Sequence, residues 1–236
     1  MDMALIRQLF TDTIDASTAL DIDPDFRARL AATLPRLAPF KIGKNGELQE
    51  WYEAYSRLPD DPRHRFTPHR HASHIVSVWP LSQITDQSDP SLFAAAKLAL
   101  INRGTGGFHP DKAAMFARLD DGDRALDPRS GSLQTGPRII GTTPPKYAAF
   151  PELFLQSQTG ALEILPALPT AFKSGHIAGL RARGNYEVSI DWADGKLTAC
   201  RIESFSGATP IVRYLGQPVD LQSDKRFTFV TVPAPR

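Results

Sequence analysis

The N-terminal half of the chain places apolar side chains at the spacing of a helix face. Near the N-terminus this spacing is followed by Ile6, Leu9, Phe10 and Ile14. Side chains three or four positions apart lie on the same side of a helix. This segment is therefore predicted to be helical, with these four residues on one face.

Aspartate-proline pairs predict the starts of two further helices. Aspartate is favoured at the N-cap and proline at the first helical position, and this pair occurs at Asp23-Pro24 and at Asp89-Pro90. Pro110 predicts the start of another helix, whose expected core residues are Phe116 and Leu119.

The last third of the chain changes from helical spacing to strict alternation. The apolar residues that alternate with polar ones in its clearest segment are Val188, Ile190 and Trp192. Asp194-Gly195 then predicts a two-residue hairpin turn, and PIVRYLG and RFTFVTV predict further strands. We therefore expect a mainly helical region over residues 1–160, followed by a small antiparallel β domain over residues 161–236.

Composition narrows the classes of partner. The 27 basic and 26 acidic residues are dispersed and leave a net charge of +1, which favours neither a nucleic acid nor a membrane as partner. The single cysteine, Cys200, excludes an internal disulfide framework and a zinc knuckle. No apolar stretch approaches the ~20 residues of a membrane span. The N-terminus also differs from a signal peptide, because Arg7 and Asp12 interrupt its apolar residues.

The segment HRHASHIVSVWP, over residues 69–80, concentrates histidines and an arginine. One explanation is a metal site in which His69 and His71 chelate as a pair. The third ligand would be His74 or His64. No CxxC, HExxH or DxDxDG motif accompanies them, and a Ser-His-Asp site at Ser73 lacks a nucleophile elbow.

Sugar recognition is the explanation that the composition favours. Histidine rings and the Arg70 guanidinium supply donors and acceptors for pyranose hydroxyls. A sugar also needs an aromatic platform, and the aromatic residues nearby are Trp51, Tyr52, Tyr55 and Trp79. Two plainer alternatives stay open, in which the histidines are hydrogen-bonded loop residues and the aromatic residues belong to the core.

Three segments, taken in order, resemble the C-terminal third of glycoside hydrolase family 95. They are NGELQEWYEAY, HRHASHIVSVWPLSQI and ELFLQSQTGALEILPALPTAFKSGHIAGLRARGNYEVSIDWADGKL. The family is known chiefly for inverting α-L-fucosidases, with some members that act on α-L-galactosides. The resemblance implies that the helices form part of an (α/α)6 barrel, or toroid, which the β domain closes.

The resemblance also implies a sugar-binding wall. In the family, the arginine and the second histidine of HRHxSH lie at the fucose-binding site, which corresponds to Arg70 and His71. His74 matches the last histidine and is expected to support this wall. Glu50, in QEW, is expected either to contact sugar or to be a buried helix carboxylate paired with Arg70. The expected substrate-binding residues are Arg70, His71, His74, His69, Glu50 and Trp51.

The motifs that carry the family's chemistry are missing from the match. An inverting hydrolase needs a general acid and, on the opposite face of the ring, a base-activated water. The resemblance places the family's acid, in an SPEN-like motif, and its NxN pair upstream of Met1. Its DGN motif falls on Gly141–Thr143, and Phe108 and His109 replace a Trp-Ser pair. We therefore expect no catalytic residue in this chain.

These departures predict an incomplete and inactive part of a family 95 α-L-fucosidase. The alternatives are a non-catalytic carbohydrate-binding remnant of the family and a histidine-rich metal-binding α/α protein. A compensating carboxylate would have to come from Glu47, Glu50, Glu53, Asp60 or Asp61.

The expected partner is a fucosylated oligosaccharide, such as a plant or host glycan, with no cofactor and no metal. Helices without all their barrel neighbours leave an apolar flank, so we expect self-association or a missing N-terminal half. Family enzymes are usually exported, and the residues of this chain do not decide its compartment.

Overall fold

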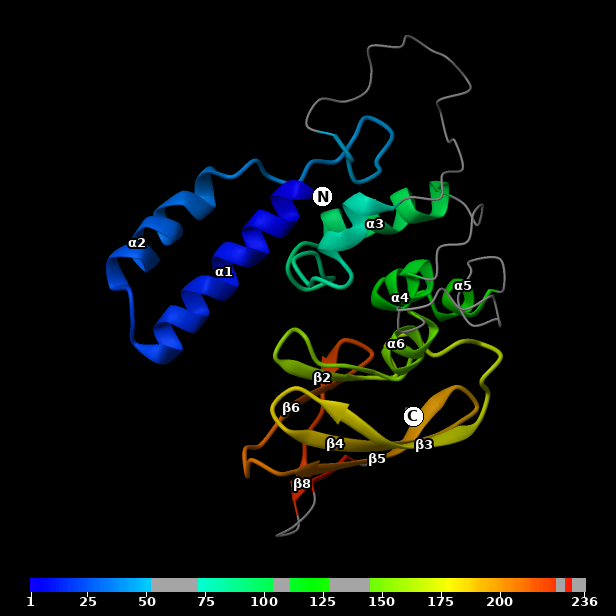
Figure 1. The fold of residues 1–236 in the computed structure, drawn as a ribbon. Coiled ribbons are helices and arrows are strands. Elements are labelled where there is room, and N and C mark those ends of the chain that lie inside the picture. Colours follow the sequence, from blue (N-terminus) through cyan, green and yellow to red (C-terminus); the bar gives the residue numbers. More distant parts are fainter. Residues whose placement is uncertain (52–71, 104–110, 128–144, 224–227, 231–236) are drawn as a thin grey trace, which may run out of the picture. The chain divides into compact units, whose positions relative to one another are not determined.

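The computed structural model describes residues 1–51, 72–103, 111–127, 145–223 and 228–230. The chain forms two compact units, residues 1–106 (unit 1) and residues 107–236 (unit 2). The change from helices to strands lies inside unit 2 (Figure 1).

The regular secondary structure in the described part of unit 1 is helical, apart from one isolated β-bridge. Its elements are α1 (Asp2–Leu20), α2 (Pro24–Thr33), the 3-10 helices η1 (Leu34–Arg36) and η3 (Ser73–Ser77), and α3 (Pro90–Asn102). Helices α1 and α2 pack against each other as a hairpin (Figure 1). Helix α1 also contacts η3. No helix in the described part of the chain is long and apolar enough to cross a membrane.

Both helix starts predicted from aspartate-proline pairs are confirmed, but only one has the expected cap. Asp89 accepts a hydrogen bond from the backbone N–H of Leu92 at 2.9 Å, as an N-cap residue should. Asp23 instead has a left-handed backbone with φ of 50°, and its side chain makes no capping hydrogen bond. The tight turn between α1 and α2 sets this conformation, since Asp21 is also left-handed.

The N-terminal helix is confirmed, but its predicted apolar face is only partly covered. Ile6, Phe10 and Ile14 are half-buried, while Leu9 is 63% exposed. The fully buried positions of α1 are instead Ala4 and Ser17. Helical spacing therefore identified the helix correctly, and Ser17 lies on the same face as Ile6, Phe10 and Ile14, whereas Leu9 lies at the exposed edge of this face.

Unit 2 begins with three short helices, α4 (Asp111–Arg118), α5 (Gly122–Leu126) and α6 (Pro145–Glu152). The predicted core residues Phe116 and Leu119 are both buried, which confirms them. Helix α4 packs against α5 and α6, and α6 leads directly into the first strand. Gly122 has no room for a side chain, because a Cβ there would lie 2.0 Å from the carbonyl oxygen of Ala167.

The strands of unit 2 form two sheets (Figure 1). One has the order β1-β2-β6-β7 and the other β3-β4-β5-β9-β8. The strands are β1 (Leu155–Gln156), β2 (Ala161–Ile164), β3 (Gly175–Ala182), β4 (Tyr186–Ala193), β5 (Lys196–Ser204), β6 (Ile211–Tyr214), β7 (Gln217–Pro218), β8 (Gln222–Ser223) and β9 (Thr228–Val230). The described pairings are antiparallel except that of β2 with β6, which is parallel.

The predicted hairpin is confirmed in β4 and β5. The apolar residues of β4 alternate with half-buried ones, and its buried residues are Tyr186, Val188, Ile190 and Trp192. Asp194 and Gly195 make the turn with φ of 52° and 72°, as a two-residue turn of type I′ requires. Phe154, just before β1, stacks on Phe172 and packs against Trp192, so aromatic side chains extend this core.

Candidate functional site

Glu50 stands at the end of a loop that is held against α3. Ile42 and Leu48 form an isolated antiparallel bridge around a turn in which Gly46 has φ of 87°. The N–H of Leu48, which is buried, donates to the carbonyl of Ala95 on α3 at 2.9 Å. This docking places the Glu50 side chain beside the C-terminal end of α3.

One part of the expectations for Glu50, its place in a helix, is corrected by this geometry. Glu50 lies in a bend and not in a helix. Its partner among the described residues is Arg103, whose Nη2 donates to Oε2 of Glu50. Arg70, the partner that we expected, lies outside the described residues.

His74 lies in η3, where its side chain is only 4% exposed. Its Nδ1 atom has no hydrogen-bond partner in the described structure and lies 4.0 Å from Oε1 of Glu50. Burial, followed by the charge of Arg103, lowers the pKa of His74 to about 3. The imidazole is therefore neutral at physiological pH. It offers one hydrogen-bond donor and one acceptor, but it does not act as a general acid there.

Arg103 is the residue of this group that sequence reasoning missed. It is the C-cap of α3, and its N–H donates to the carbonyl of Ala99. Its side chain is 22% exposed and that of Glu50 is 23% exposed, so the ion pair lies at the edge of the buried region. The only available signal was a single arginine directly after an apolar helix, which by itself indicates no partner.

Other unsatisfied polar atoms lie on the same segments. Among the described residues, buried side-chain atoms without a hydrogen-bond partner include Oε2 of Glu47, in the docked loop, and Nδ2 of Asn102, at the end of α3. An unpaired buried polar atom costs about 1–3 kcal/mol. A hydrogen-bonding partner at any of these atoms would therefore stabilise the folded chain.

The other expected site residues are placed only in part. Trp51 directly follows Glu50 and is 60% exposed, as an aromatic platform has to be. Trp79 is half-buried. The remaining residues named from the sequence lie outside the described residues. They are Glu53, Asp60, Asp61, His64, His69, Arg70, His71, Phe108, His109 and Gly141–Thr143. Over the described ranges, no three His, Cys, Asp or Glu residues group together as metal ligands would.

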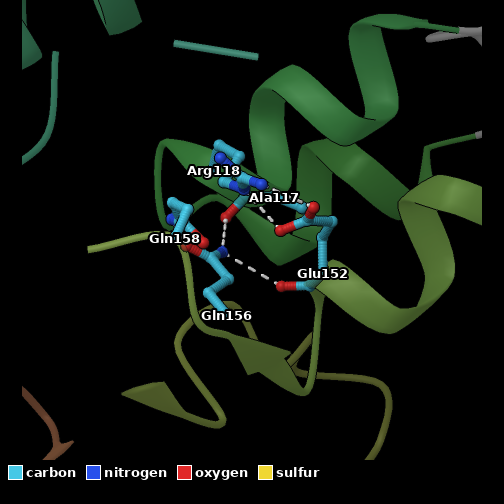
Figure 2. Close-up of polar contacts among 5 residues, drawn as sticks. All are labelled: Ala117, Arg118, Glu152, Gln156 and Gln158. Atoms are coloured by element: carbon cyan, nitrogen blue, oxygen red, sulfur yellow. Dashed lines mark hydrogen bonds and ion pairs between the residues drawn. The ribbon is translucent and has the colours of Figure 1, made fainter. Parts of the chain in front are cut away.

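A second polar cluster, in unit 2, is structural (Figure 2). The guanidinium of Arg118 on α4 pairs with both carboxylate oxygens of Glu152 on α6, with Nη2 2.8 Å from Oε1. Gln156, buried on β1, donates to the carbonyls of Ala117 and Glu152 at 2.9 and 3.0 Å. These contacts tie α4, α6 and β1 together.

Comparison with known proteins agrees with the sequence resemblance. Residues 1–158 match the model of the glycosyl hydrolase family 95 catalytic domain, and residues 156–233 match that of the glycoside hydrolase family 95 C-terminal domain. The chain is 31% identical to "Alpha-L-fucosidase 2" of Arabidopsis thaliana over 97% of its own length and 30% of that protein.

Two fungal relatives are more distant. Both are described as "Probable alpha-fucosidase A", and they come from Aspergillus oryzae and Aspergillus niger. They are 26% and 25% identical over 80% and 84% of this chain, which correspond to 31% and 29% of the fungal proteins. The chain thus spans less than a third of the length of each of these relatives.

Proposed function

Because the chain belongs to glycoside hydrolase family 95, we propose that it carries part of the sugar-binding wall of an inverting α-L-fucosidase. Its ligand is then a terminal α-L-fucosyl unit, or the related α-L-galactosyl unit, of an oligosaccharide. The names of the three relatives support this class of substrate.

The observation that carries the proposal is the group formed by Glu50, His74 and Arg103. A carboxylate held by a guanidinium lies 4.0 Å from an unpartnered, neutral imidazole nitrogen. Neutral donors and fixed acceptors suit the hydroxyl groups of a sugar better than they suit a charged ligand. The exposed indole of Trp51, one residue from Glu50, supplies an apolar surface for a sugar face. We propose that Arg70, His71 and His69 complete this wall.

We further propose that the helices belong to an (α/α)6 barrel. Helices of such a barrel bury both an inner and an outer face, and α1 exposes apolar side chains that a neighbouring helix would cover. Leu5 and Leu9, one turn apart on α1, are exposed, and so is Phe26 on α2. These exposed side chains indicate that another element packs on the α1–α2 hairpin, either further barrel helices or a second copy of the chain.

The chain alone is proposed not to hydrolyse fucosides. Its sequence has no SPEN, NxN or DGN motif, so the general acid and the water-positioning groups that the resemblance implies are lacking. General acid–base assistance is worth ~10²–10⁴-fold for each group. His74 does not replace them, since it is neutral and lies only 4.0 Å from Glu50, so the two residues would not act from opposite faces of a sugar ring.

The test combines turnover with binding. The purified chain is mixed with a nitrophenyl α-L-fucoside, and L-fucose binding is followed by NMR in the chain and in Arg70→Ala and His71→Ala. We expect no turnover, and millimolar binding that both substitutions weaken. Turnover that disappears in these variants would contradict the proposed lack of activity, and unchanged binding in them would contradict the wall.

The non-catalytic carbohydrate-binding remnant is separated from this proposal by the coding sequence before Met1. An in-frame NxN and SPEN there would support a hydrolase, whereas their absence from the transcript would favour the remnant.

A further inference from the structure

Arg103 determines where the Glu50 carboxylate points. Its side chain extends from the C-terminal end of α3, a helix whose buried residues include Ala99 and Leu100, so its base is fixed. It donates to Oε2 of Glu50. A guanidinium presents its donors in a rigid plane, so it restricts the rotation of the carboxylate that it binds.

The loop that carries Glu50 is also held to α3 through its backbone. The backbone N–H of Leu48, two residues before it, donates to Ala95 of α3 at 2.9 Å. The backbone of this loop and the side chain of Glu50 are thus both hydrogen-bonded to residues of α3 or its C-cap. Once Oε2 is held by Arg103, the remaining oxygen Oε1 is the one directed towards His74, at 4.0 Å from Nδ1.

The distance between Oε1 and Nδ1 is that expected of two atoms bridged by one hydroxyl group. A distance of 4.0 Å is too long for a direct hydrogen bond. A hydroxyl oxygen about 2.8 Å from each atom would donate to Oε1 and accept from Nδ1–H. Nδ1 is buried and has no partner in the described structure, so such a hydroxyl would satisfy an atom that is otherwise unpaired.

We propose that Arg103 is a positioning residue, which orients Glu50 so that Glu50 and His74 together bind one hydroxyl of the sugar. This inference rests on the proposed function and adds a residue and an atomic arrangement to it. Arg103 itself does not touch the hydroxyl. It acts by keeping Oε1 at the distance from His74 at which both atoms reach the same oxygen.

The experiment follows the imidazole nitrogens of His74 in a full-length chain with ¹⁵N-labelled histidine, before and after addition of L-fucose. The test variants are Arg103→Met and Arg103→Lys. The control is Arg118→Met, which breaks another arginine–glutamate pair at the edge of the buried core, in unit 2. A His74→Gln variant assigns the signals, and circular dichroism verifies folding of each variant.

In the wild-type chain, L-fucose should shift the Nδ1 signal of His74. Arg103→Met should weaken fucose binding about tenfold, the factor that one hydrogen bond to a charged group is worth. Arg103→Lys, which keeps the charge, should retain part of the response, and it replaces Arg103→Met as the decisive variant if the latter does not fold. Arg118→Met should bind fucose as the wild type does.

The outcomes separate this inference from the proposed function. If L-fucose does not shift the His74 signal of the wild-type chain, the sugar-binding role of this wall is overturned, and the inference with it. A normal fucose response in wild type, kept unchanged in Arg103→Met or, if that is unfolded, in Arg103→Lys, overturns the positioning role alone. Equal losses in Arg103→Met and Arg118→Met would also overturn it, because they would indicate a general effect of stability.

Discussion

Oε1 of Glu50 lies 4.0 Å from Nδ1 of His74, although the two residues come from different segments of unit 1. One segment is a loop docked on α3 and the other is the 3-10 helix η3. The candidate site exists because both segments, together with the end of α3, bring their polar groups to one place.

The first prediction concerns the acid sensitivity of unit 1. The pKa of His74 is lowered to about 3 in the folded chain, below the ~6.5 of an unfolded histidine. The unfolded state therefore binds more protons between these pH values. We expect the stability contributed by a neutral His74 to be complete above about pH 6.5 and to be lost towards pH 3, by up to about 1.4 kcal/mol per pH unit.

Hydrogen–deuterium exchange of the α3 amides at pH 7 and pH 5 measures this change. The control is His74→Gln, in which the contribution of this ring to the pH dependence should disappear. An identical loss of protection in wild type and in the variant would show that His74 does not cause it.

The second prediction concerns association through α1. Leu5 and Leu9 are exposed one turn apart, and burying apolar side chains of this kind stabilises a protein interface. The isolated chain should therefore self-associate in light scattering, and Leu5→Glu/Leu9→Glu should reduce its apparent mass. Thr11→Glu is the matched control, because it adds a negative charge on another side of the same helix. A monomeric wild-type chain would contradict this use of α1.

The third prediction tests the packing of α5. A Cβ at Gly122 would lie 2.0 Å from the carbonyl oxygen of Ala167, which is backbone and has little freedom to move. Gly122→Ala should lower the free energy of unfolding of unit 2 by about 1–3 kcal/mol, as overpacking does. Urea unfolding measures it. Gly43→Ala, in unit 1, is the control, because the nearest atom to its Cβ would be a side-chain oxygen of Glu47 at 3.1 Å and not a backbone atom. An equal effect of both substitutions would contradict the tight contact.

The fourth prediction concerns the thiol. Cys200 is buried on β5, and burial, with a smaller effect of the Asp191 charge, raises its pKa to about 12. Only the thiolate reacts with iodoacetamide. We expect almost no alkylation of the folded chain at pH 8 and complete alkylation in denaturant, as measured by mass spectrometry. Rapid reaction of the folded chain would show that β5 opens readily.

Local features were decided by the sequence itself. The Asp89 cap and the Asp194-Gly195 turn depend on interactions that span at most three residues, and the structure contains both. The same is true of the alternation in β4, which follows from the two-residue period of a strand. Motif order was equally informative about the family, since it needs no knowledge of contacts.

Long-range features were decided only by the tertiary structure. Leu9 shows helical spacing but is exposed, because the face that α1 buries depends on what packs against it. The partnership of Glu50 with Arg103, and the parallel pairing of β2 with β6, join segments far apart in the chain. Such pairings depend on the summed packing of the whole unit and not on local conformational preference. For this reason Arg103, which orients the candidate site, was invisible in the sequence, whereas Glu50 and His74 could be named from their motifs.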